Sequence, residues 1–286
     1  MKRILVCTDG SKFSQSSYHY AAWLAHRLDA GVDILHVTDV RSQKVVSTDN
    51  FSGTLGLDAS RELLDKLVEL EHEKARLAHQ QSKLILEDAA QFFSGEGIAF
   101  NTIHETGFLI DIFHEFESRA DAIVMGKRGE RAEFASEHLG SNIERIVRSS
   151  HKPCWISSRE FKPIDRLLLA YDGSPSSEKM LQFMIDFPVF EGLELHILKV
   201  TKHPDDATAV QRLRQAEHKA RLAGFDPVCS LLPGHPEKTI ATYIEEQDIS
   251  LLLMGAYGHS RIRHLIVGST TIQMLRSSHI PVLLFR

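Results

Sequence analysis

The sequence predicts an α/β protein made of two tandem doubly wound domains, each a five-stranded parallel sheet flanked by helices. Two observations carry this prediction. Short apolar runs of strand length alternate with longer segments of helical periodicity, which is the pattern of βαβ units and a parallel sheet. The same order of segments then recurs in the second part of the 286-residue chain, which indicates an internal duplication.

The first copy contains five runs that we expect to be strands: 3–9, 32–37, 98–105, 122–126 and 153–156. Apolar residues at helical spacing predict a helix that ends with Gly31 as its C-cap, and short helices at Leu109–Glu117 and after Gly140. Residues 41–60 are rich in Ser, Thr, Asn and Gly, so we expect an exposed loop there. A long charged helix with one leucine-rich face should follow from Arg61 to about Phe93.

The second copy repeats this order with strands expected at 166–171, 193–200, 227–232, 250–255 and 281–285, and helices at 207–222, 240–246 and 272–276. Corresponding residues lie about 128 apart, as Gly126 and Gly255 or Pro153 and Pro281 show. Asp9 and Asp172 lie 163 apart, so the first copy carries about 34 extra residues, which the loop and the long helix supply. We place the domains at residues 1–158 and 165–286.

The most informative motif lies in the second copy. The apolar run Ser250–Met254 stops at Gly255, and Gly258 and then Gly268, Ser269 and Thr270 follow before a helical segment. A strand, a glycine loop and the free N–H groups of a helix start favour phosphate binding. The glycines permit positive φ and close approach of the backbone to a ligand. His259, Arg261 and Arg263 lie in the loop, where they either neutralise phosphate charge or face solvent.

The spacing Gly-x2-Gly-x9-Gly-(Ser/Thr) resembles the nucleotide-binding signature of the universal stress protein (Usp) family, and the resemblance covers nearly the whole chain as two copies. It implies strand order 3-2-1-4-5 in each sheet, with a ligand crevice at the carboxyl ends of strands 1 and 4. It also implies that Asp172 contacts adenine or ribose, and that Ala170 and Val200 line the adenine pocket. Alternatively, Asp172-Gly173-Ser174 is a turn with a helix N-cap, and both interpretations can hold together.

The first copy departs from the signature. Ten residues, rather than nine, separate Gly129 from Gly140 and Ser141, although Asp9, Gly126 and Gly129 occupy the expected places. Glutamates at 130, 133 and 137 would repel phosphate, and Lys127, Arg128 and Arg131 offset part of that repulsion. We therefore expect nucleotide in the second copy and leave the first copy open.

Composition excludes several classes of protein. The net charge is -5, which argues against a nucleic-acid surface, and no apolar run is long enough for a membrane span. The three cysteines, Cys7, Cys154 and Cys229, are odd in number and far apart, which favours reduced thiols over disulfides or a metal site. The start of the chain lacks the apolar core of a signal peptide, so we expect a cytoplasmic protein.

Catalysis finds little support in the sequence. No Gly-x4-Gly-Lys-(Ser/Thr) loop occurs, no nucleophile with its base can be placed in the crevice, and no histidine pair has zinc spacing. The expected metal is only Mg²⁺ that accompanies a nucleotide. We expect at most slow ATP hydrolysis.

The sequence therefore predicts a protein that binds ATP, or AMP or ADP in its place, and acts in stress response or signalling. The rival hypothesis is a dimeric scaffold or interaction protein with empty crevices. Both hypotheses expect the final strands of the two copies to pair with each other, because a bare apolar edge strand invites association. Both also allow a homodimer of the whole chain, and a partner-binding role for the long charged helix remains an alternative.

Overall fold

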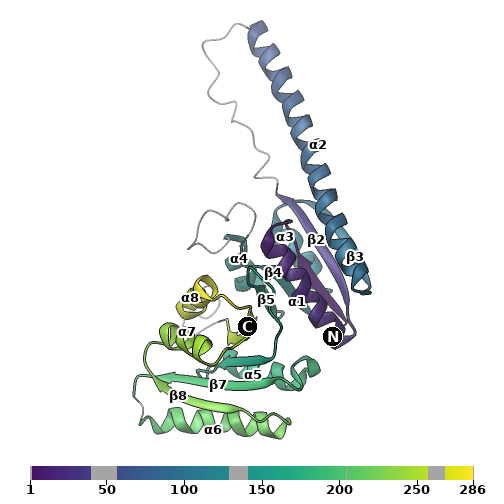
Figure 1. The fold of residues 1–286 in the computed structure, drawn as a ribbon. Coiled ribbons are helices and arrows are strands. Elements are labelled where there is room, and N and C mark those ends of the chain that lie inside the picture. The colour runs from purple at the N-terminus through teal and green to yellow at the C-terminus, as the bar shows by residue number, and fades with distance from the viewer. Residues whose placement is uncertain (1, 40–56, 129–140, 204, 257–267, 286) are drawn as a thin grey trace.

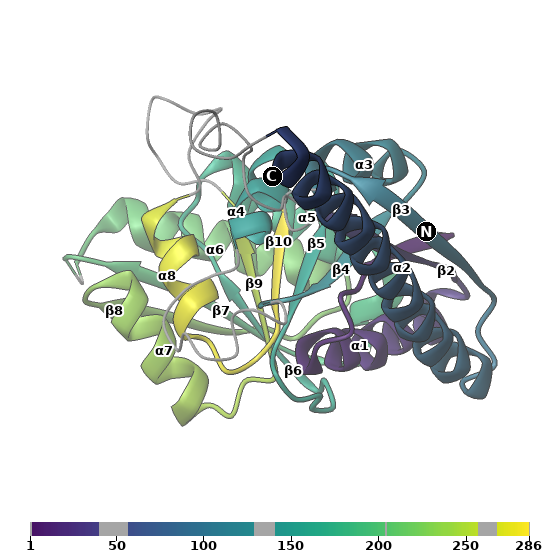
Figure 2. The same cartoon turned by 90° about the horizontal axis from the view of Figure 1, so that it is seen from above.

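The fold is that of a computed structural model, which describes residues 2–39, 57–128, 141–203, 205–256 and 268–285, without the side chains of 57–64 and 141. Within these residues, ten strands form one sheet in the order β3-β2-β1-β4-β5-β10-β9-β6-β7-β8 (Figures 1 and 2). Each half of this order reproduces the predicted 3-2-1-4-5 arrangement. Below, the first half means β1–β5 with their helices, and the second half means β6–β10 with theirs.

The first half follows the predicted elements closely. Its strands are β1 (Arg3–Cys7), β2 (Gly31–Asp39), β3 (Phe100–Gly107), β4 (Ala122–Gly126) and β5 (Cys154–Ser157). Its helices are α1 (Lys12–Leu28), α2 (Leu57–Gly95), α3 (Leu109–Glu117) and α4 (Ser141–Ser149).

The second half repeats the plan without the long helix. Its strands are β6 (Arg166–Ala170), β7 (Glu194–Thr201), β8 (Val228–Pro233), β9 (Leu251–Gly255) and β10 (Val282–Phe285). Its helices are α5 (Pro175–Asp186), α6 (Ala207–Leu222), α7 (Pro236–Glu246) and α8 (Ser269–Ser277), and the short 3-10 helix η4 (Pro188–Phe190) follows α5. The division of the chain into two domains, with a boundary between residues 158 and 165, stays a prediction.

The two halves join through their last strands, as predicted. β5 and β10 pair antiparallel, with Trp155 opposite Leu283, whereas the neighbouring pairs in each half are parallel. The strands of the two halves therefore run in opposite directions across the sheet. As a result, the carboxyl ends of β1 and β4 point in one direction along the strands, and those of β6 and β9 point in the opposite direction.

Buried side chains cover both faces of the sheet, which explains why the strands are nearly continuous apolar runs. Along β1, Ile4 and Val6 belong to one core cluster and Leu5 to the other. Trp155 is 1% exposed and packs in the same cluster as residues of the second half, such as Leu283. The halves thus share continuous cores as well as a sheet.

Two predicted boundaries were wrong. Gly31 is not the C-cap of α1, because Asp29 holds the left-handed cap position at φ 48° and its N–H bonds to the carbonyl of Ala25. Gly31 instead begins β2. The long helix begins at Leu57, so residues 57–60 are helical rather than part of the predicted loop, and 41–56 lie outside the described residues.

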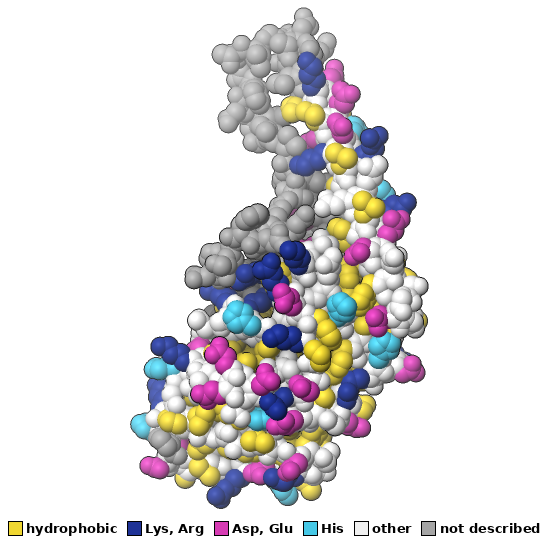
Figure 3. Space-filling view, in the orientation of Figure 1, with side chains coloured by type: hydrophobic (Ala, Val, Ile, Leu, Met, Phe, Trp, Pro, Cys, Tyr) yellow, Lys and Arg dark blue, Asp and Glu magenta, His cyan; other side chains and the backbone are white. Residues whose placement is uncertain are grey.

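Helix α2 projects well beyond the rest of the protein (Figure 1). Its C-terminal part covers β2 and β3 and buries Ser82, Ala89 and Phe93. Along the projecting part, apolar side chains alternate with charged ones on the face seen in Figure 3, and Leu70 and Leu77 are more than half exposed. No helix in the described ranges is long and apolar enough to cross a membrane.

Candidate functional site

A cavity of about 790 Å³ opens in the second half where β6 and β9 end. This is the predicted switch point between strands 1 and 4 of that half, where open parallel sheets bind ligands. The volume falls within the roughly 300–1,000 Å³ that is usual for small-molecule sites. Seven of the predicted site residues line this crevice: Ala170, Asp172, Val200, Gly255, Gly268, Ser269 and Thr270.

The turn after β6 has the geometry of the plainer interpretation. An oxygen of the Asp172 carboxylate accepts the N–H of Ser174 at 2.8 Å, and the Ser174 hydroxyl accepts the N–H of Ser177, which caps α5. Gly173 has φ 77°, a conformation that glycine adopts at little cost. Asp172 is nevertheless exposed at the mouth of the crevice, so this turn also presents its carboxylate to the cavity.

Gly255 is needed for packing, and not for a positive φ. It does not have φ in the left-handed region. A Cβ there would lie 2.5 Å from the hydroxyl oxygen of Ser176 and 2.9 Å from its carbonyl carbon, because the first turn of α5 presses against the end of β9. Gly255 therefore does not use the positive φ that glycine permits. The close approach that it permits is to a helix.

Helix α8 directs its first turn into the crevice. Gly268 occupies the N-cap position and supplies no side-chain hydrogen bond, so the first backbone N–H groups of α8 have no side-chain cap. Such groups carry partial positive charge and bind anions. The Thr270 hydroxyl donates to a carboxylate oxygen of Glu237 at 2.8 Å, and the Thr271 hydroxyl donates to the carbonyl of Gly255. These bonds hold the helix start against α7 and β9.

Two cations in the crevice were missed by the sequence analysis. Lys199 is 6% exposed, and its Nζ donates to the backbone carbonyl of Asp172 at 2.8 Å. Burial lowers the pKa of Lys199, and Asp172 opposes this effect. Arg212 of α6 lies against Gly173, since a Cβ on that glycine would be 2.8 Å from its Cδ. Asp206 is the fourth charged residue of the described lining. The lining therefore carries two acidic side chains, Asp172 and Asp206, and two basic ones, Lys199 and Arg212.

Several predicted residues lie outside the described residues: Gly258, His259, Arg261 and Arg263 in the second half, and Gly129 and Gly140 in the first. The same holds for the loop glutamates at 130, 133 and 137, for Arg131 and for the side chain of Ser141. Their contacts with a ligand stay predictions.

The corresponding place in the first half has a different chemistry. Asp9 forms the same turn, with its carboxylate accepting the N–H of Ser11 at 3.1 Å. However, the first-half counterpart of Lys199 is His36, whose Nδ1 lies 2.8 Å from the carbonyl of Thr8. The counterpart of Arg212 is Ile85, which lies within 2.7 Å of a Cβ placed on Gly10. Gly126 packs against Phe13, as Gly255 packs against Ser176.

Three histidines lie near this first-half turn. The ring of His104 is 5.8 Å from that of His36 and 5.3 Å from that of His79, centroid to centroid, and its Nε2 is 2.9 Å from the Thr38 hydroxyl. Burial and the two neighbouring imidazoles lower the pKa of His104. In the part of the chain that the structure describes, no group of three His, Cys, Asp or Glu side chains could hold a metal ion.

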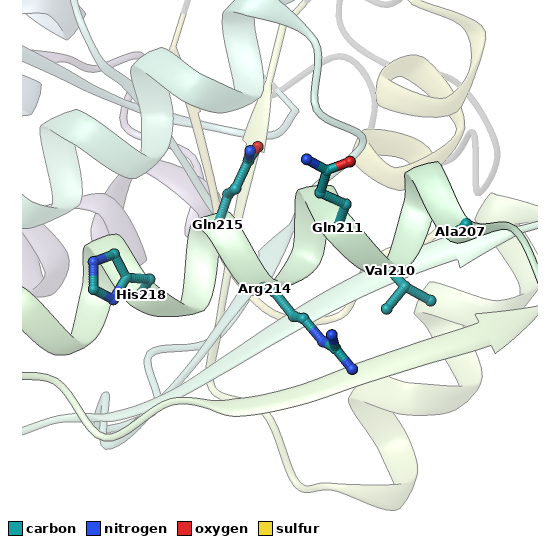
Figure 4. A pocket seen from close by; sticks show the side chains of 6 residues that line it. All are labelled: Ala207, Val210, Gln211, Arg214, Gln215 and His218. Atoms are coloured by element: carbon teal, nitrogen blue, oxygen red, sulfur yellow. The ribbon is translucent and has the colours of Figure 1, made fainter.

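A shallow groove runs along the outside of α6. Figure 4 shows that Gln211 and Gln215 point to one side of the helix, while Val210 and Arg214 point to the other. All of its lining residues belong to one helix, and their polar groups do not converge. We therefore assign no function to this groove.

The fold and the crevice define an open α/β protein in two copies, with a ligand-sized cavity at a switch point. The sequence pattern of the Universal stress protein family matches residues 1–158 and 163–286. The chain belongs to this family.

Two relatives cover essentially the whole chain. Universal stress protein Slr1230 of Synechocystis sp. is 50% identical over 287 residues, which is 100% of both chains. The crystal structure of a universal stress protein from Archaeoglobus fulgidus DSM 4304 has a TM-score of 0.72 at 24% identity and covers 99% of this chain and 98% of its own.

A universal stress protein from Archaeoglobus fulgidus solved in complex with dAMP covers 44% of this chain and 100% of its own at 17% identity, with a TM-score of 0.35. That ligand is a property of that protein.

Proposed function

We propose that the chain binds an adenine nucleotide, ATP or in its place AMP or ADP, in the second-half crevice and serves as a nucleotide-responsive stress or signalling protein. One observation carries the proposal: the exposed turn at Asp172 and the uncapped start of α8 at Gly268 line one cavity of about 790 Å³. The first supplies an acceptor for a ribose or base, and the second supplies N–H donors for phosphate. Mg²⁺ would accompany the phosphates of ATP.

The apolar part of the crevice suits a purine. Ala170, Val200, Ile240 and Met254 line it beside the polar groups. Lys199 and Arg212 add positive charge on the side of β7 and α6. An apolar wall with a few convergent polar groups is the usual composition of a cofactor site.

The test begins with the purified protein. Denaturation should release ATP, ADP or AMP that chromatography identifies, and the emptied protein should bind ATP in calorimetry. Gly268→Asp should abolish this binding, because it places a carboxylate where the phosphates meet α8. Gly95→Asp is the matched control, since a Cβ at Gly95 meets nothing within 4 Å. Unchanged affinity of Gly268→Asp for ATP would leave only the scaffold hypothesis.

For association, we propose a homodimer formed by α2. Leu70, Leu77 and Leu84 are each more than half exposed and recur every seven residues, the repeat of a coiled coil. With these leucines at position d, Lys66 falls at g and Glu71 at e, which are complementary charges for a parallel copy of the same helix. A second copy of this chain is therefore the partner that the face fits.

A further inference from the structure

A second large cavity lies where the two halves meet, and we call it the junction pocket. Its volume is about 870 Å³. Its lining comes from the end of β4, the linker after β5, the start of α1 and the last turn of α8: Phe13, Lys127, Arg128, Arg159, Glu160, Lys162, Gln273, Arg276, Ser277, Ser278 and His279. Neither Asp9 nor any residue of the second-half crevice lines it.

The junction pocket is strongly basic in an acidic protein. Five lysines and arginines and one glutamate line it, whereas the whole chain has a net charge of -5. Among the ion pairs of the described residues, none involves Lys127, Arg159, Lys162 or Arg276. Elsewhere in the second half, Arg166 and Arg221 do bind carboxylates. These four cations therefore have no ion pair with a carboxylate among the described residues, although Glu160 lies in the same lining.

Lys127 is the most unusual of these cations because it is only 7% exposed. Its Nζ donates to the carbonyl of Ser278 at 2.8 Å, which joins the first half to the second. Burial, and to a smaller extent Arg128, lower its pKa to about 8. A buried cation whose partner is a neutral carbonyl costs free energy, and an anion in the cavity would offset this cost.

We propose that the junction pocket binds a small anion carrying two or more phosphoryl groups. Lys127 and Arg128 from the first half, Arg159 and Lys162 from the linker, and Arg276 from α8 surround the space that it would occupy. Guanidinium groups bind phosphate oxygens in pairs, and several cations spread around one cavity fit a ligand with several charges. The basic groups surround a cavity, whereas nucleic-acid surfaces show a basic stripe or face.

Inorganic tripolyphosphate is the probe for this site. Calorimetry should show wild-type protein binding it with an affinity that falls as salt is raised. The double variant Lys162→Gln/Arg276→Gln should lose at least tenfold in affinity, and it should fold, because both side chains are exposed. The matched control is Arg214→Gln/Lys238→Gln, which removes two exposed cations outside the junction pocket.

The crevice could also take up tripolyphosphate, so the two sites need separate variants. Gly268→Asp should keep tripolyphosphate binding at the junction pocket, and Lys162→Gln/Arg276→Gln should keep ATP binding at the crevice. The proposal is overturned if wild-type protein does not bind tripolyphosphate, if the junction variant binds it as tightly as wild type, or if Gly268→Asp abolishes it.

Discussion

Thr270 and Arg276 lie on the same nine-residue helix, α8, but line different cavities. Thr270 faces the second-half crevice, and Arg276 faces the junction pocket. They are six positions apart along the helix, a rise of about 9 Å. Because α8 is one packed element, a shift that adapts its first turn to a nucleotide also moves its last turn.

This relationship predicts coupling between the two proposed ligands. Saturating tripolyphosphate should change the dissociation constant of ATP by about fivefold or more, the lower end of usual allosteric coupling. ATP should change the affinity for tripolyphosphate by the same factor, because equilibrium coupling is reciprocal. Paired calorimetric titrations measure both.

The control for coupling is the variant Lys162→Gln/Arg276→Gln. Direct competition of tripolyphosphate for the crevice would persist in this variant, whereas coupling through α8 should disappear. An effect of equal size in variant and wild type would therefore contradict the coupling.

Arg212 should contribute to nucleotide binding although the motif does not include it. Its side chain lies over the Asp172-Gly173 turn and lines the crevice. Arg212→Ala should weaken ATP binding about tenfold, roughly 1.4 kcal/mol, as expected for loss of one charge-assisted contact. Arg214→Ala, on the outer side of the same helix, is the control and should bind ATP like wild type.

The chain should bind one ATP, in the second half. In the first half, His36 and Ile85 replace the cations Lys199 and Arg212, and Ile85 lies against Gly10. Calorimetry or equilibrium dialysis should give a stoichiometry near one per chain. Two equivalents would contradict this prediction, and Asp9→Ala would then show whether the second equivalent occupies the first-half turn.

Lys127 should make stability depend on pH in the alkaline range. The folded state releases this proton near pH 8, and the unfolded state holds it to about pH 10.5. The unfolded state therefore binds more protons between these values, so the contribution of Lys127 to the free energy of unfolding should rise through this window, by roughly 3 kcal/mol in all.

Denaturant titrations of wild type and Lys127→Met isolate this contribution from other titrating groups. Lys127→Met should be the more stable protein at pH 7, and the difference should shrink toward pH 10. Lys162→Met, which removes an exposed lysine, serves as the control. Parallel pH profiles of wild type and Lys127→Met would contradict the prediction.

The leucine stripe of α2 should control association. Leu70→Glu/Leu77→Glu should convert a dimer into a monomer, as light scattering after size exclusion would measure, because charges would replace the apolar seam. Val68 and Ala75 lie on another face of the helix, and Val68→Glu/Ala75→Glu should leave the dimer intact. A wild-type monomer at micromolar concentration would refute this assembly.

Most of the fold could be predicted from the sequence because its strands are buried on both faces. Runs such as Ala122–Gly126 and Leu251–Gly255 are apolar throughout and stop where the chain turns. The pairing of β5 with β10 followed from the need to cover two apolar edges. Helix α5, which the elements expected for the second copy omit, begins with Pro175, Ser176 and Ser177, residues that are also typical of a turn.

The site was predictable only in part. Asp172 and Gly268 follow apolar strands or precede a helix, so their positions could be read locally. Lys199 could have been predicted as a site residue, because a lysine within an apolar strand needs a hydrogen-bond or charge partner when it is buried. Nothing in the sequence distinguishes Arg212 from Arg214, which are two residues apart and face opposite sides. The junction pocket depends on contacts such as Lys127 with Ser278, 151 residues apart.

The antiparallel pairing of β5 with β10 joins two similar domains within one polypeptide. A chain with a single such domain would form this contact only by association with a second copy. A homodimer of single domains must carry every substitution twice, at symmetry-related positions. Here each half can mutate alone, so a histidine at 36 does not impose a histidine at 199. Because the two halves are covalently linked and not related by symmetry, each can carry different side chains at corresponding positions.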